Sequence, residues 1–140
     1  MATRRELARA ASDLRIVLGQ LIRRLRAENT FPISHATVLS RLDRGGPATT
    51  SALAAAERVR PQSMAQTLAE LEAAGLIERR PDPGDGRRIL IELTPRGQQV
   101  LGEDRRRREG WLAGAIAELS EEEQALLIRV VPLLRRLAGG

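Results

Sequence analysis

The fold of this chain is decided by the stretch from Thr49 to Thr94, TTSALAAAERVRPQSMAQTLAELEAAGLIERRPDPGDGRRILIELT. It predicts a short, alanine-rich helix over residues 51–57, and Thr49 has the side chain to cap that helix. A turn over residues 58–60 leads to a second helix from Pro61, where proline is tolerated because a first-turn N–H has no helical partner. Two helices joined by so tight a turn indicate a helix-turn-helix.

The second helix has an apolar face and a polar face. Met64, Leu68 and Leu71 recur at i, i+4 and i+7, which makes one apolar stripe, and Gly75 is expected just beyond the helix end. The opposite face carries side chains that can bond base edges: Gln62, Ser63, Gln66 and Thr67. Because Gln can pair with adenine through two hydrogen bonds, and Ser or Thr can serve either base, we expect this face to read DNA bases.

A charged β-hairpin follows the second helix. Residues 76–80 form an apolar run that turns basic, residues 81–86 are dense in turn formers, and residues 88–93 are β-branched and apolar. We expect the hairpin tip at Asp85-Gly86-Arg87-Arg88. A helix-turn-helix followed by a basic hairpin can reach both grooves of duplex DNA. The expected contacts to DNA phosphates come from Thr49, Arg60, Arg79 and Arg88.

Three motifs in this stretch resemble those of the multiple-antibiotic-resistance regulator (MarR) family. They are Gly75-Leu76-Ile77-Glu78-Arg79 at the entry to the hairpin, Asp85-x-Arg87 at its tip, and Leu93-Thr94-x-x-Gly97 at its exit. The motifs cover about a third of the chain, and the order of the remaining helices extends the resemblance over nearly all of it. There is one departure, because the family often has Ser or Thr where Arg60 precedes the proline of the recognition helix. Arg60 cannot cap the helix by accepting an N–H bond, but it can reach a phosphate.

The resemblance implies a winged helix-turn-helix regulator that acts as a homodimer on a pseudo-palindromic operator. It implies that Arg87 enters the minor groove and that Asp85 orients it, the alternative for Asp85 being a simple turn residue. It also implies a small effector, often aromatic or anionic, between the dimer helices and the DNA-binding lobe. His35 and Trp111 are the candidate pocket residues. The alternatives are an ordinary polar residue near a helix start for His35 and a core or interface residue for Trp111.

Composition is that of one globular domain with a basic surface. The 140 residues are 42% hydrophobic and 29% charged, and the net charge of +5 with a pI of about 11.3 makes an acidic partner plausible. Many soluble domains are mildly basic without such a partner. All 23 basic residues are arginine, which suits bidentate pairing with phosphate or guanine but equally fits a GC-rich genome. Phe31 and Trp111 are the only aromatic residues, which argues against single-stranded nucleic acid as the ligand.

Several other classes of protein find no support in the sequence. There is no cysteine for disulfide or thiol chemistry, and a single histidine cannot build a multi-histidine metal site, so we expect no metal and no cofactor. No apolar run approaches the roughly 18 residues of a membrane span, and no signal peptide is visible, so we expect a cytoplasmic protein. No nucleophile–base pair or glycine-rich phosphate loop is visible, and we expect no enzymatic activity.

The flanking segments read as helices. Apolar residues form one stripe from Leu7 to Leu25, and a second helix begins at Ser34 and ends at Gly45-Gly46-Pro47. Thr94 and Pro95 open a long helix that extends to about Leu119. The four arginines at 105–108 span a whole helical turn, so we expect a solvated helix face in which they pair with Glu103, Asp104 and Glu109.

The last helix opens with a capping box formed by Ser120 and Glu123. Its apolar residues cover more than one stripe: Leu126, Leu127, Val130, Val131, Leu133, Leu134 and Leu137. A small monomer has no reason to expose so much apolar surface, so we expect a homodimer. Pro132 lies inside this helix, where proline costs roughly 3 kcal/mol, and we expect a kink over residues 129–131.

Taken together, these patterns predict a mainly α fold, a single winged helix-turn-helix domain over residues 1–140 with a two-stranded wing. The DNA-binding lobe is expected over about 34–94, and dimerisation helices over 1–30 and 95–140. The expected function is that of a sequence-specific regulator of transcription on double-stranded DNA, a repressor whose binding a small effector relieves. The alternative is a winged-helix module that binds protein and not DNA. The polar face of the second helix argues against that alternative, because it offers hydrogen bonds and no bulky apolar patch.

Overall fold

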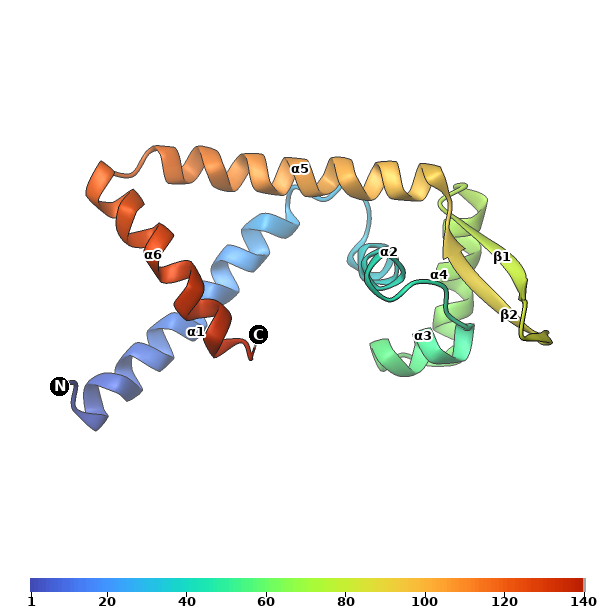
Figure 1. Ribbon diagram of the computed structural model, residues 1–140, viewed down its shortest axis with the longest axis horizontal. Helices are drawn as coiled ribbons and strands as arrows, with labels where there is room; N and C mark the ends of the chain where they lie inside the picture. Colours follow the sequence, from blue (N-terminus) through green and yellow to red (C-terminus); the bar gives the residue numbers. More distant parts are fainter. Residues whose placement is uncertain (140) are drawn as a thin grey trace.

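The computed structural model describes residues 1–139, so Gly140, the last residue of the expected C-terminal segment, lies outside the described part. Residues 1–139 form a mainly helical chain with one antiparallel two-stranded sheet (Figure 1). In order, the elements are α1 (Arg4–Arg26), α2 (Ile33–Gly45), α3 (Thr50–Glu57), α4 (Pro61–Ala73), β1 (Ile77–Asp82), β2 (Asp85–Leu93), α5 (Pro95–Ala117) and α6 (Glu121–Leu137). This order confirms the predicted winged helix-turn-helix with long helices on either side. We call α2 to β2 the winged lobe.

The helix boundaries follow from local chemistry. The Thr49 hydroxyl accepts a hydrogen bond from the Ala52 N–H at 3.1 Å, and the Thr94 hydroxyl accepts one from the Gly97 N–H at 3.0 Å. The capping box at α6 is also present. The Ser120 N–H donates to the Glu123 carboxylate at 3.0 Å, and this bond lowers the pKa of Glu123 below its ordinary value of 4.5.

The end of α4 confirms the role predicted for Gly75. Its φ of 76° lies in the left-handed region that favours glycine. The Gly75 N–H donates to the Glu72 carbonyl, and the Leu76 N–H donates to the Leu71 carbonyl, which is the Schellman pattern. The chain therefore reverses sharply at this point and enters β1 directly.

The hairpin tip lies earlier in the sequence than predicted. The two-residue turn is Pro83-Gly84, and Asp85 already belongs to β2, where it is paired with Asp82. The physical reason is that the Asp82 carboxylate accepts the Gly84 N–H at 2.9 Å, which closes the turn at once. The register then shifts, because the next pair is Pro81 with Ile89. Residues 86–88 consequently form an irregular segment of β2 close to the tip.

The core lies in the winged lobe and extends to the first turns of α5. It contains Val38, Leu39, Leu42, Leu53, Ala54, Met64, Leu68, Leu71, Leu76, Ile77, Ile91 and Leu101. The predicted α4 stripe of Met64, Leu68 and Leu71 is thus confirmed as buried. An additional pair of backbone hydrogen bonds joins Ala48 to Ile91 at 2.7 and 3.0 Å, which ties the segment before α3 to the middle of the wing. The helix-turn-helix and the wing are therefore held as one body.

The long helices α1, α5 and α6 extend beyond the winged lobe. In Figure 1, α5 spans the molecule from the wing to its opposite end, and α6 turns back from there. Within the described chain, neither α1 nor α6 contains a fully buried residue. Helix α6 runs through Pro132 without a break. The kink expected over residues 129–131 stays a prediction.

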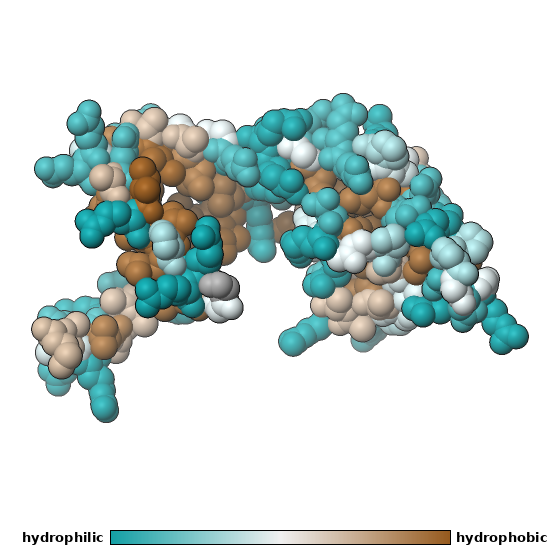
Figure 2. All heavy atoms as spheres, in the orientation of Figure 1, coloured by the Kyte–Doolittle hydropathy of each residue, from teal (hydrophilic) through white to brown (hydrophobic). Residues whose placement is uncertain are grey.

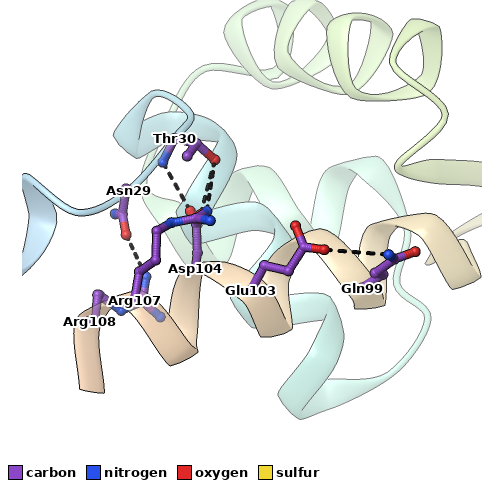
Figure 3. Close-up of polar contacts among 7 residues, drawn as sticks. All are labelled: Asn29, Thr30, Gln99, Glu103, Asp104, Arg107 and Arg108. Atoms are coloured by element: carbon purple, nitrogen blue, oxygen red, sulfur yellow. Dashed lines mark hydrogen bonds and ion pairs between the residues drawn. The ribbon is translucent and has the colours of Figure 1, made fainter. Parts of the chain in front are cut away.

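The arginine run on α5 is largely exposed, as expected, but one of the acids predicted to pair with it is not. Asp104 is completely buried, although it was predicted to be one of the solvated acids. Its carboxylate accepts hydrogen bonds from the Thr30 N–H at 3.2 Å and the Thr30 hydroxyl at 3.0 Å, and it pairs with Arg107 (Figure 3). The pairing of Asp104 with an arginine of the run is as predicted. Its expected exposure was wrong, because Thr30 lies 74 residues away and leaves no local signal in the sequence.

Candidate nucleic-acid interface

The polar face of α4 is available to a ligand over most of its length. Gln62, Ser63 and Gln66 are exposed, while Thr67 is half-buried. Ser63 and Thr67 both line a groove of about 260 Å³ between α4 and α2. The structure therefore brings the predicted base-reading residues together on one helix face, with Thr67 set at its edge.

The start of α4 leaves the Arg60 side chain without a capping contact on its own helix. Arg60 is the N-cap, is exposed, and its side chain makes no capping hydrogen bond, as expected for a residue that can only donate. First-turn N–H groups without a side-chain cap favour anions at a helix N-terminus. Arg60 and these N–H groups can thus approach the same phosphate.

The wing arginines differ in how they are held. Arg87 is exposed and takes part in no ion pair within residues 1–139. Asp85 accepts the backbone N–H of Arg87 at 3.1 Å, so the contact between these residues orients the chain rather than the guanidinium directly. Arg88 lies 3.9 Å from the Asp82 carboxylate, an exposed and weak pairing. Both arginines can therefore turn toward a phosphate or a groove.

The other two residues expected at the DNA backbone have internal partners as well. Arg79 donates to the Glu72 carboxylate of α4 at 3.3 Å, and both side chains are more than a third exposed. Such a pair contributes little on its own and can exchange for a phosphate. The Thr49 hydroxyl accepts the Ala52 N–H and also lies 3.3 Å from the Ser51 hydroxyl, where either oxygen can be the donor.

The structure does not bring the two predicted effector residues together. The His35 Nε2 lies 2.7 Å from a Glu70 carboxylate oxygen on α4. Trp111 is on α5, where the Arg24 guanidinium of α1 lies 4.4 Å from the centre of its ring. Neither side chain lines the cavity that Ile22, Arg26 and Arg108 help to form.

That cavity lies between α1, α2 and α5 and has a volume of about 370 Å³. Its apolar wall comes from Ile22, Leu25, Ile33 and Ala36. Its basic wall comes from Arg26, Arg41, Arg44 and Arg108, and Glu57 is its single acid. The Arg41 guanidinium lies 2.5 Å from that Glu57 carboxylate. Sequence reasoning missed these residues, since they come from four separate segments. The one local hint was Arg41 and Arg44, which lie three residues apart on one helix face.

Comparison with known proteins identifies the family to which this chain belongs. A model of the MarR family matches residues 30–88. An uncharacterized HTH-type transcriptional regulator of Mycobacterium bovis is 37% identical over 133 residues, which is 93% of this chain and 93% of that protein. The chain belongs to the MarR family. It is therefore a winged-helix transcriptional regulator, a class that binds DNA and is not enzymatic.

Solved structures agree with the family assignment. A putative transcriptional regulator from Pseudomonas aeruginosa is 43% identical to this MarR-family chain, with a TM-score of 0.82 over 98% of each chain. A mutant of MepR from S. aureus, bound to an oligodeoxyribonucleotide, shares the fold at a TM-score of 0.71 and 20% identity, over 93% of this chain and 96% of its own. In the described residues of this regulator, no helix is long and apolar enough to cross a membrane. The same residues contain no cluster of three acidic or histidine side chains that could hold a metal ion.

Proposed function

We propose that this MarR-family regulator binds a pseudo-palindromic operator as a homodimer and represses transcription until a small molecule releases it. One observation carries the DNA-binding part of the proposal. The exposed face of α4, with Gln62, Ser63 and Gln66, lies on the same lobe as two exposed arginines, Arg60 and Arg87, that make no ion pair within residues 1–139. Hydrogen-bonding groups flanked by free cations suit base edges flanked by phosphates.

The expected arrangement on DNA follows from the shape of the lobe. Helix α4 would enter the major groove, with Gln62, Ser63, Gln66 and Thr67 at the base edges. Arg87 would enter the neighbouring minor groove from the wing. Thr49, Arg60, Arg79 and Arg88 would contact the backbone. The DNA-bound MepR mutant supports this arrangement through its shared fold.

The long helices support the homodimer. Apolar side chains on both are exposed in the single chain, including Ile16, Val17 and Ile22 on α1 and Leu126, Ile128 and Leu133 on α6. Figure 2 shows the apolar surface gathered at the end of the molecule that holds α6 and the last turns of α5. A second copy would cover this surface and place two α4 helices about one helical turn of DNA apart.

The cavity between α1, α2 and α5 supports control by an effector. Its apolar wall and its arginines suit a small anion with an apolar body, which an aromatic acid satisfies. The cavity lies between α2 of the winged lobe and the helices α1 and α5, which we expect to take part in the dimer. An occupant would therefore change the spacing of the two winged lobes. We further propose that the protein works in the cytoplasm.

Gel-shift selection from a random duplex pool tests the DNA-binding proposal. We expect one enriched pseudo-palindrome whose affinity falls steeply with salt. Arg87→Ala should weaken binding to it substantially without changing the fold, since the side chain is exposed. Arg106→Ala, which removes the same charge from an exposed position on α5, is the matched control and should have little effect. A pool that yields no enriched sequence would rule out specific readout, and equal losses in the two variants would show that the wing acts only through net charge.

A further inference from the structure

The single histidine of the chain contacts the recognition helix. His35 is in the first turn of α2, and its Nε2 lies 2.7 Å from the Glu70 carboxylate on α4. The imidazole is largely enclosed, with 17% of its side chain exposed, whereas half of the Glu70 side chain is exposed. An enclosed ring has few orientations, so His35 offers the half-exposed Glu70 carboxylate, which only accepts, a hydrogen-bond donor in a fixed position.

The other oxygen of the same carboxylate contacts a base-reading residue. Glu70 Oε1 accepts a hydrogen bond from Gln66 Nε2 at 3.4 Å, one turn earlier on the exposed face of α4. This bond is long and exposed and would contribute little if Glu70 were free to rotate. In the structure one orientation of the Glu70 carboxylate contacts both His35 and Gln66. His35, Glu70 and Gln66 thus form a chain of contacts from the inside of the lobe to its DNA-facing surface.

The chemistry of Glu70 determines which way the Gln66 amide faces. An ionised carboxylate only accepts hydrogen bonds, so the NH₂ group of Gln66 must face it and the carbonyl must face away. One N–H of the amide is then engaged with Glu70. The carbonyl oxygen and the second N–H stay available as an adjacent acceptor and donor. In the major groove, this pair complements the N6 donor and the N7 acceptor of adenine.

We propose that His35 is a positioning residue for base readout, which acts through Glu70 to hold the Gln66 amide in the orientation that selects adenine. This inference rests on the proposed function, because it requires that α4 reads the major groove. His35 touches no DNA in this scheme. Its effect is on preference between bases, whereas a purely structural residue would alter affinity for all sequences alike.

A double-mutant cycle on base discrimination tests the proposal. The measured quantity is the ratio of Kd values for the selected operator and for operators altered at single base pairs. Gln66→Ala should reduce this ratio at one adenine per half-site, by roughly 5- to 140-fold. His35→Ala should reduce it at the same position, by about 2- to 12-fold, the range for one hydrogen bond. In the Gln66→Ala background, His35→Ala should have no further effect on discrimination.

Two variants separate positioning from loss of stability. His35→Gln retains an N–H donor of similar reach and should restore part of the discrimination. Leu42→Val trims a buried core residue on the same helix, far along α2 from Glu70. It should lower thermal stability without changing the preference at the Gln66 position.

The outcomes distinguish this inference from the proposed function. If the wild type selects an operator but Gln66→Ala alters no base preference, the inference is wrong and specific DNA binding stands. The same holds if the position affected is not adenine, or if His35→Ala reduces discrimination further without Gln66. If the wild type selects no sequence, both fail together.

Discussion

Gly97 makes the tightest close approach of any glycine in the described chain. A Cβ built at this position would lie 2.1 Å from the Leu76 carbonyl oxygen and 3.3 Å from a methyl carbon of Leu93. The first turn of α5 therefore lies directly against the backbone that enters β1. This contact gives the Leu93-Thr94-x-x-Gly97 motif a physical cause, since Thr94 caps the helix and Gly97 lets it pack.

Gly97→Ala should destabilise the protein by about 1–3 kcal/mol, because the obstructing atom is backbone and cannot rotate away. Urea unfolding followed by circular dichroism measures the change. Gly110→Ala is the matched control on the same helix, where an added Cβ meets nothing within 4 Å. It should stabilise the helix by up to about 1 kcal/mol. A Gly97→Ala variant as stable as the wild type would show that α5 can move off Leu76 at no cost.

At the scale of single residues, the sequence predicted hydrogen-bond partners only where the two residues lie close together along the chain. The caps Thr49, Thr94 and Ser120 were predicted and confirmed, because each bonds an N–H only three residues away. The partners of His35 and Asp104 lie 35 and 74 residues away and had no local signature. Both were assigned to other environments for that reason.

Among the elements, α5 is anchored to the turn between α1 and α2 by a polar cluster. Asp104 pairs with Thr30 and Arg107, and one turn on, Arg108 donates to the Asn29 side chain at 2.5 Å (Figure 3). Arg105 reaches the Asp43 carboxylate of α2 at 3.1 Å. A buried carboxylate is stable only when its hydrogen bonds are satisfied, and within residues 1–139 no buried side-chain nitrogen or oxygen lacks a partner. The cluster therefore fixes how the long helix meets the winged lobe.

Asp104→Ala should destabilise the protein by about 1–3 kcal/mol, since the Thr30 N–H and hydroxyl would lose their acceptor. Glu103→Ala is the matched control, because Glu103 is the adjacent acid but bonds only Gln99 of its own helix, at 3.4 Å (Figure 3). Such a pair contributes roughly 0.2–0.5 kcal/mol. Thermal unfolding of both variants gives the comparison. Equal shifts in Tm would mean that Asp104 is no anchor and that its burial is incidental.

The elements themselves were predictable and the wing turn was not. Periodicity, caps and Pro61 located each helix to within a few residues. The turn-forming residues from Pro81 to Gly86 are compatible with several positions of the hairpin turn, so composition alone did not identify the turn. The turn forms at Pro83-Gly84 because the Asp82 carboxylate accepts a hydrogen bond from the Gly84 N–H, a contact that residue type alone does not predict.

At the scale of the whole molecule, the long helices α1 and α6 leave apolar side chains uncovered in the single chain. The winged lobe has a compact core, yet α6 has no fully buried residue among those described, and Ile128 and Leu126 are 71% and 60% exposed. Every side chain of α1 and α6 is therefore at least partly exposed in one copy. A two-fold pairing would bury the same apolar surface twice and set the distance between the two α4 helices.

Light scattering should accordingly give a mass of about 31 kDa, twice the 15.4 kDa of one chain. Deleting the chain from Glu121 onward should yield a monomer or an aggregate. Leu133→Glu is the milder test, because this side chain is 51% exposed in one copy and its replacement should not unfold the monomer. Operator affinity should fall in both variants far more than from losing one DNA contact, since a single half-site gives up the second set of contacts and the gain in effective concentration.

Arg129→Glu is the control for that series, because it places the same carboxylate on α6 at a position that is already charged and exposed. It should leave the mass and the affinity near those of the wild type. A wild-type chain that stays a monomer at micromolar concentration and still binds a palindromic site tightly would contradict the dimer. It would also remove the proposed route of effector control, because a ligand between α1, α2 and α5 can change the spacing of two lobes only where two lobes are joined.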